Sequence, residues 1–191
     1  MRHILVINGN PDADHKRLSA GIANAYAAAA QASGHEVRRI DIGALNFPLI
    51  RSQQDFMAPV ADASIQKAQA DVKWADHLVF VYPLWLGSLP ALLKAFLEQV
   101  FRYGFGLGQN SRGLPRGLLK GRSAHVFVTM GMPGFFYRWV FGAFGERALE
   151  RSILRLCGIG PIKRTIVGGV GSNGACQRGL EKAAAAGMRG K

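Results

Sequence analysis

The stretch that decides the fold is His3–Asn8 (HILVIN), which a polar loop joins to the alanine-rich segment Leu18–Ser33. A nearly continuous apolar run is typical of a parallel strand that is buried on both faces of its sheet. In the segment that follows, Ile22 and Tyr26 recur at helical spacing, and Gly34 ends the pattern. A strand, a loop and a helix in this order predict the first unit of an α/β domain.

The same alternation of apolar runs and helical patterns continues along the whole chain. Further strands are expected at Val37–Ile42, His77–Tyr82, Ser123–Met130 and Ile162–Val170. Further helices are expected at Ala63–Ala75, from Pro90 to about Phe101, at Phe135–Cys157 and at Gln177–Ala186. The segments Asn46–Asp62 and Gly104–Gly121 are expected to be irregular, the second as a surface excursion. This pattern predicts one α/β domain over residues 1–191, with an open five-stranded parallel sheet covered on both faces.

The composition fits a domain with a buried core, because 49% of the 191 residues are hydrophobic and 19% are charged. The formal net charge of +12 predicts attraction to anions and excludes an acidic surface of the calcium-buffer type. No nucleic-acid partner is expected, because no RNA- or DNA-reading motif accompanies this charge.

The cysteines and the apolar stretches indicate in which cellular compartment the protein is expected. Cys157 and Cys176 are too few for a disulfide framework or a cysteine-based zinc cluster, so reduced thiols in the cytoplasm are expected. No secretory signal is recognised. The longest uncharged stretch, Leu78–Leu93, contains Pro83 and Pro90, which argues against a membrane span.

The loops after the first, third and fourth strands are the candidate sites, because open parallel sheets bind ligands beyond the carboxyl ends of their strands. The first loop runs from Asn8 to Ser19, and its backbone amides with the following helix N-terminus form a natural anion site. Lys16, Arg17 and the Ser19 hydroxyl would add charge and hydrogen bonds to a phosphate. The dinucleotide fingerprint and the P-loop ending are both missing, and an ordinary polar connection is the alternative.

The second and third loops have features of a site for a flat ligand. In the second, Pro83–Pro90, the indole of Trp85 would lie against a heterocycle; the alternative is packing in the core or in a dimer interface. In the third, Thr129–Gly134, two glycines let the backbone approach a ligand closely. The aromatic run Phe135–Phe141 follows, which indicates a partner subunit or a flat substrate unless it forms a core helix.

The distribution of charged residues along the chain predicts a site for a bound cofactor and not an acid–base cluster. The stretch 99–145 holds six Lys or Arg and no acidic residue, which would steer a phosphorylated anion such as a pyridine nucleotide. Neither a hydrolase triad nor a metal-binding motif is present, so no metal site is expected. Cofactor-shaped loops without an acid–base cluster indicate that a cofactor carries the reaction.

Three stretches, Asn8–Leu18, Tyr82–Lys94 (YPLWLGSLPALLK) and Val128–Tyr137, together resemble the flavodoxin-like NAD(P)H:quinone oxidoreductases. This family includes DT-diaphorase, bacterial quinone reductases and the ancillary reductases of potassium efflux systems. The resemblance covers nearly the whole chain and implies a three-layer flavodoxin-like fold with a five-stranded parallel sheet. It also implies a bound flavin and a homodimer with the flavin at the subunit interface.

The resemblance assigns site residues by position. The flavin phosphate would be held by the loop with Asn10, His15, Arg17, Leu18 and Ser19. The isoalloxazine would be lined by Pro83, Leu84, Trp85, Leu86 and Gly87. Its pyrimidine edge would contact Thr129, Met130 and Gly131, and the catalytic residue would be Tyr137, near the reacting ring.

The implied reaction is a ping-pong transfer of two electrons from NAD(P)H through the flavin to a quinone or a similar flat acceptor. The short first loop and the chain length favour FMN, with FAD as the alternative, and the arginine-rich stretch favours NADPH. Asn10 stands where relatives commonly have histidine, and Ala143 and Phe144 replace the histidine often found after the tyrosine. A regulatory flavin- or nucleotide-binding subunit of a membrane transporter, with little turnover, is therefore the alternative function.

Overall fold

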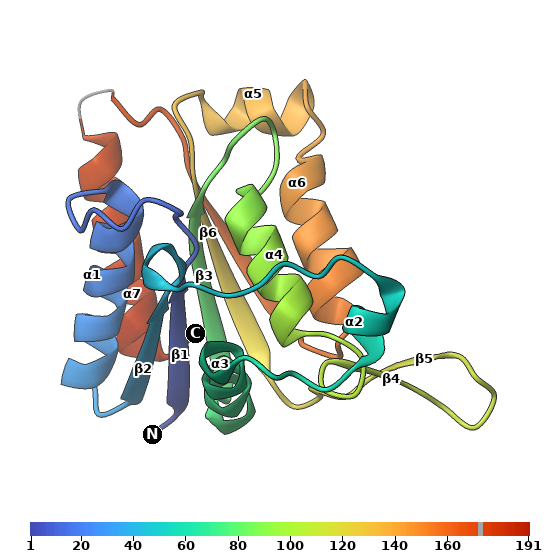
Figure 1. Cartoon of the computed structure of the whole chain (residues 1–191). Helices are drawn as coiled ribbons and strands as arrows, with labels where there is room; N and C mark the ends of the chain where they lie inside the picture. The colour runs from blue at the N-terminus through green and yellow to red at the C-terminus, as the bar shows by residue number, and fades with distance from the viewer. Residues whose placement is uncertain (172–173) are drawn as a thin grey trace.

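The computed structural model describes residues 1–171 and 174–191 and has three layers, with one parallel sheet between two layers of helices (Figure 1). The strand order is β2-β1-β3-β6-β7, and every neighbouring pair is parallel. The five strands are β1 (His3–Asn8), β2 (Glu36–Asp41), β3 (His77–Pro83), β6 (Ser123–Thr129) and β7 (Ile162–Val167). The predicted fold class, α/β with a five-stranded parallel sheet, is confirmed.

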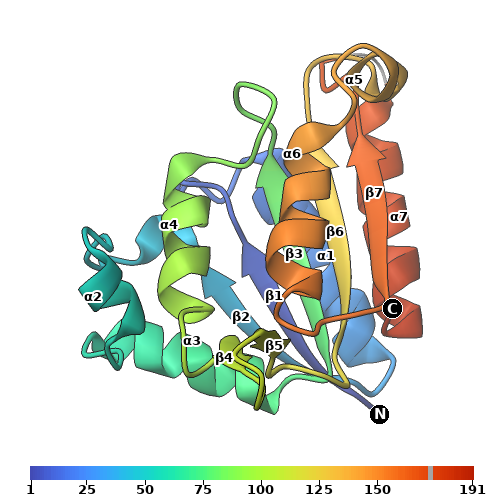
Figure 2. The ribbon, with the colours of Figure 1, turned by 90° about the vertical axis from the view of Figure 1, so that its right-hand side faces the viewer.

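Each face of the sheet is covered by its own helices (Figures 1 and 2). One face packs against α1 (Leu18–Ala32) and α7 (Ala175–Arg189), and the other against α3 (Ala63–Trp74) and α4 (Ala91–Val100). Successive side chains of β1 point to opposite faces of the sheet and so pack in two different hydrophobic cores. Ile4 and Val6 pack in the core under α1 and α7, and Leu5 and Ile7 pack in the core under α3 and α4. This double burial explains the continuous apolar runs in the sequence.

The expected helix Phe135–Cys157 was wrong as one element. The structure divides it into α5 (Gly134–Trp139), α6 (Phe144–Arg147) and the π-helix η2 (Ala148–Arg155). The break comes at Gly142 and Ala143, whose φ angles of 60° and 49° lie in the left-handed region and cannot continue a right-handed helix. The reversal turns α5 across the carboxyl end of the sheet (Figure 1).

Two segments that were expected to be irregular contain short elements. The Gly104–Gly121 excursion holds an antiparallel hairpin of β4 (Leu107–Gln109) and β5 (Pro115–Gly117). The Asn46–Asp62 segment holds α2 (Gln53–Met57), which a reciprocal Ser52–Asp55 capping box starts. The remaining element, the 3₁₀ turn η1, spans Ile42–Ala44. In the described part of the chain no helix is both long and apolar enough to cross a membrane.

The strand order sets the position of the candidate loops. The chain runs outward from β1 to β2 and then returns to place β3 on the other side of β1, so the order reverses between β1 and β3. The loops after β1, β3 and β6 therefore meet at one edge of the sheet, where the crevice of a doubly wound sheet lies.

The packing of α7 on α1 gives a stability prediction. In Gly187→Ala the new Cβ would lie 2.3 Å from the carbonyl oxygen of Tyr26 in α1, so the helices must separate. We expect the free energy of unfolding in urea to fall by about 1–3 kcal/mol. Gly21→Ala, also in a helix of this interface, meets only the side chain of Leu180 at 3.4 Å and should raise it by about 0.5–1 kcal/mol. Equal effects of the two substitutions would contradict this packing.

Candidate functional site

Residues of all three candidate loops line one cavity of about 390 Å³ at the carboxyl edge of the sheet. Seven of its eight lining residues were predicted from the sequence, and Asp12 is the exception. The seven are Asn10, Arg17, Leu18, Ser19, Pro83, Trp85 and Thr129. The topology thus brings together residues that are more than 100 positions apart in the chain.

The first loop holds a buried hydrogen-bonded pair at the start of α1. The Asn10 side-chain amide donates to Ser19 Oγ at 2.9 Å, and Asn10 Oδ1 accepts from the Asp12 backbone amide at 3.1 Å. Both side chains are almost fully buried. Because Ser19 Oγ accepts from Asn10, its own proton remains available for an acceptor in the cavity.

Arg17 lies at the exposed mouth of this cavity. Its Nε donates to Asp12 Oδ2 at 2.7 Å and lies 3.8 Å from Asp14 Oδ2. A hydrogen bond from the Asp14 backbone amide and a second from Arg17 lower the pKa of Asp12 below its usual range, so this carboxylate is ionised at neutral pH. The two Nη groups of Arg17 make no hydrogen bond within residues 1–171 and 174–191. They can therefore bind an anion while Nε keeps its hydrogen bond to Asp12.

The second loop is a tight reversal with an apolar tip. Trp85 and Ser88 exchange backbone hydrogen bonds of 2.9 and 3.0 Å, and the two residues between them, Leu86 and Gly87, have φ angles of 46° and 77°. Positive φ at both central residues is the geometry of a type I′ turn, which is strained for leucine. The Leu86 side chain is fully exposed, and the Trp85 ring is half exposed beside the cavity.

The third loop is tied to the second and to the sheet edge. The Leu84 backbone amide donates to the Thr129 carbonyl at 2.8 Å, and the Met130 amide donates to the Val167 carbonyl at 3.0 Å. Thr129 and Met130 are buried, whereas the backbone of Gly131 is exposed and has open space where a Cβ would be. The exposed glycine leaves room for a ligand next to the loop.

Tyr137, which the resemblance places near the reacting ring, does not line the 390 Å³ cavity. Its ring is fully buried, its hydroxyl donates to the Gly87 carbonyl at 3.3 Å, and it accepts from the Glu146 backbone amide at 3.4 Å. Burial raises the pKa of this hydroxyl. In this arrangement Tyr137 supports the second loop from beneath, and its catalytic contact stays a prediction.

The other predicted residues do not line the 390 Å³ cavity. His15 is exposed on the first loop, and Leu84, Leu86, Gly87, Met130 and Gly131 contribute to the loop framework around it. On the far side of Trp85 lies a second, more apolar cavity of about 720 Å³ between the second loop and η2.

Sequence reasoning missed two acidic residues near these loops. Asp12 lines the cavity, and its place in the loop was the only signal. Glu146 is buried behind Tyr137, where its Oε1 accepts from Arg164 at 3.3 Å and burial raises its pKa despite that partner. Only the tertiary structure brings Glu146 to Arg164, which is 18 positions away.

Comparisons with known proteins identify the family of the fold. The family model of the flavodoxin-like fold matches residues 2–187. An uncharacterized NAD(P)H oxidoreductase of Haemophilus influenzae is 28% identical over 175 residues, which are 89% of this chain and 85% of that protein. An FMN-dependent NADH:quinone oxidoreductase of Bordetella avium is 35% identical over 78 residues, 41% of this chain and 36% of that protein.

The structural comparison shows the same fold. An NAD(P)H:quinone oxidoreductase from Methanothermobacter marburgensis superposes with a TM-score of 0.82 at 21% identity, covering 100% of this chain and 99% of that one. The chain spans less than two thirds of the length of several curated relatives that it matches, the Bordetella avium protein among them.

Proposed function

The chain belongs to the family of the flavodoxin-like fold, and from this membership we propose that it is a flavin-dependent NAD(P)H:quinone oxidoreductase. The observation that carries the proposal is the cavity in which Asn10, Ser19, Trp85 and Thr129 converge from three loops. The name of the Haemophilus influenzae relative supports NAD(P)H oxidation, and the name of the Bordetella avium relative supports FMN-dependent quinone reduction.

We propose FMN as the cofactor. The first loop fits a single phosphate, because Ser19 and Arg17 line the same cavity at the start of α1, the first with its hydroxyl proton and the second with its Nη groups. Trp85 and Pro83 supply an apolar wall for a ring, and Thr129 lies at its polar edge. The FMN-dependent relative supports this cofactor over FAD.

When bound, FMN would supply the two-electron chemistry, accepting hydride from NAD(P)H and passing electrons to a quinone-like acceptor. The chain's own residues would hold the planes and exclude water. The exposed Leu86 and the half-exposed Trp85 would cover the ring, while Tyr137 keeps the second loop in place through the Gly87 carbonyl. The exposed backbone at Gly131 would face charge on the reduced ring.

We further propose that the protein works as a homodimer in the cytoplasm. The support for a partner subunit is a group of exposed aromatic side chains on α5, the following loop and the start of α6. Its members are Phe136, Phe141 and Phe144. Both cysteines are free, which suits a reducing compartment.

A visible absorbance titration tests the activity. The chain is mixed with FMN or FAD, then reduced anaerobically with NADPH and reoxidised with a quinone. We expect an FMN spectrum perturbed by Trp85, bleaching with NADPH and recovery with the quinone. Failure to bind either flavin would overturn the proposed function, and tight FMN binding without bleaching would exclude the enzyme activity.

A further inference from the structure

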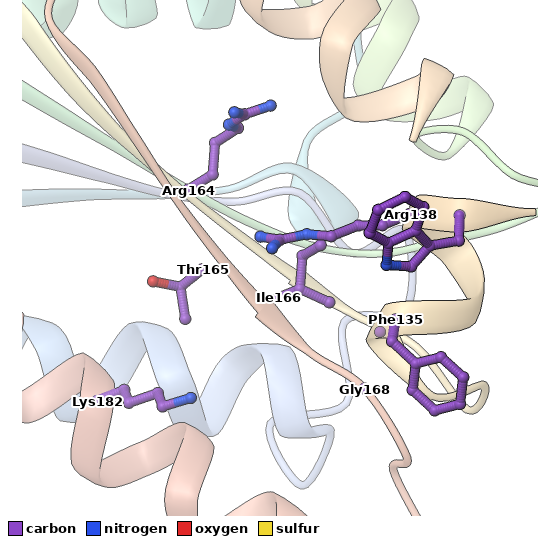
Figure 3. Close-up of a pocket in the computed structure, with 9 residues that line it drawn as sticks. Phe135, Arg138, Arg164, Thr165, Ile166, Gly168 and Lys182 are labelled. Atoms are coloured by element: carbon purple, nitrogen blue, oxygen red, sulfur yellow. The ribbon is translucent and has the colours of Figure 1, made fainter. Parts of the chain in front are cut away.

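A groove of about 470 Å³ lies at the free edge of the sheet, between α5, β7 and α7 (Figure 3). Phe135, Arg138 and Trp139 of α5 line one wall, and Lys182 of α7 lines the other. Figure 3 shows Arg138 reaching toward Ile166 on one side of β7, and Lys182 on the other side of this edge strand with Thr165. The volume is within the range of small-ligand sites, roughly 300–1,000 Å³.

Two cations of this groove are available to a ligand. Arg138 and Lys182 make no hydrogen bond or ion pair within the described ranges, and both are exposed. Arg164 is different, because it pairs with Glu146 and Glu150 at 3.3 Å each. It extends from the same side of the strand as Ile166, opposite to Thr165 and Lys182 (Figure 3). No carboxylate is among the described residues that line the groove. The groove therefore attracts an anion.

Aromatic surface adjoins these cations. Phe135 is 68% exposed and Trp139 is 86% exposed, although both rings are large and apolar. An exposed ring beside unpaired cations is suited to a ligand that carries both a flat heterocycle and phosphate.

The groove is built onto the third loop of the FMN site. Gly169 donates its backbone amide to the Met132 carbonyl at 3.0 Å, and Val170 donates to the Met130 carbonyl at 3.1 Å. At Gly168 a Cβ would lie 2.5 Å from the Gly134 amide nitrogen, so strand and loop pack backbone to backbone. Thr129 lines the cavity and Gly134 lines the groove, so one short loop separates the two.

We propose that this groove binds the adenosine phosphate half of the nicotinamide nucleotide and selects NADPH over NADH, an inference that rests on the proposed function. Arg138 and Lys182 bind the 2′-phosphate, and Phe135 or Trp139 stacks on the adenine. NADH lacks the 2′-phosphate, so the two cations distinguish the nucleotides without touching the reacting ring.

The test compares two double variants of the FMN-loaded protein. Arg138→Ala with Lys182→Ala should raise the KM for NADPH about tenfold and leave kcat and the KM for NADH within about twofold. Arg51→Ala with Lys73→Ala removes the same two charges from exposed positions outside the groove and should change neither KM. Calorimetry with 2′,5′-ADP is the readout that needs no turnover, and its Kd should rise about tenfold in the first variant only.

The outcomes separate this inference from the proposed function. Equal changes in the KM for NADPH and NADH, or unchanged 2′,5′-ADP binding in the groove variant, would overturn the inference while the enzyme activity stands. If neither nucleotide reduces the parent protein, the proposed function fails. In that case, 2′,5′-ADP binding that depends on Arg138 would still support a binding site for a phosphorylated nucleotide in the groove.

Discussion

An Arg17→Ala variant is expected to bind FMN about 10- to 100-fold more weakly than the parent chain, because a charge-assisted hydrogen bond to phosphate contributes about 1.5–3 kcal/mol. Arg17 lines the cavity, and its Nη groups are available because only Nε contacts Asp12. The Kd is measured by flavin fluorescence quenching at fixed ionic strength, since salt screens an exposed cation.

Lys16→Ala is the matched control for this variant. Lys16 carries the same charge one position earlier on the exposed loop, but it does not line the cavity. Its removal should change the Kd for FMN less than about threefold. Riboflavin, which lacks the phosphate, should bind the parent and Arg17→Ala equally. A loss of riboflavin affinity equal to that of FMN would show that Arg17 shapes the loop and does not bind the phosphate.

Acidification is expected to destabilise the parent chain by about 2–3 kcal/mol between pH 6.5 and 4.5, and His77 is the main cause. The His77 ring is 2% exposed at the start of β3, and its Nδ1 lies 2.8 Å from Ser123 Oγ. Burial, with the charges of His125, Arg2 and Lys163, lowers its pKa from 6.5 to about 3. In this window the unfolded chain binds a proton that the native protein does not, so stability falls as the pH falls.

A His77→Gln variant should remove most of this slope, because glutamine keeps a hydrogen-bonding group toward Ser123 and does not titrate. The measurement is the free energy of unfolding in urea at several pH values from 7.5 to 4.5. His15→Gln, on the exposed first loop, is the control and should keep the parental slope. The explanation is wrong if His77→Gln retains the full slope; a uniform loss of stability at every pH would leave it intact.

The sequence alone determined the sheet and the edge at which the site lies. Strand β1 was predicted at its observed bounds, since a strand buried on both faces has a local apolar pattern that no neighbour needs to complete. The right-handed connections of parallel strands then place the loops after β1, β3 and β6 at one edge. Of the seven predicted residues that line the observed cavity, the loop patterns themselves indicated Arg17, Ser19 and Trp85, and the family resemblance implied the others.

Tertiary contacts decided the rest. The apolar pattern of a helix is the same with or without a break, so Phe135–Cys157 was expected to be one helix. In the structure it is divided at Gly142 and Ala143, whose φ angles are positive. The direction of the Tyr137 hydroxyl depends on the Gly87 carbonyl, 50 positions earlier in the chain. The pairing of Arg164 with Glu146 and Glu150 depends on α6 and η2, which the fold brings next to β7, whereas Arg138 makes no ion pair within residues 1–171 and 174–191. Sequence periodicity reports which face of an element is buried, whereas the partner of each polar group is determined by elements that meet only in the folded chain.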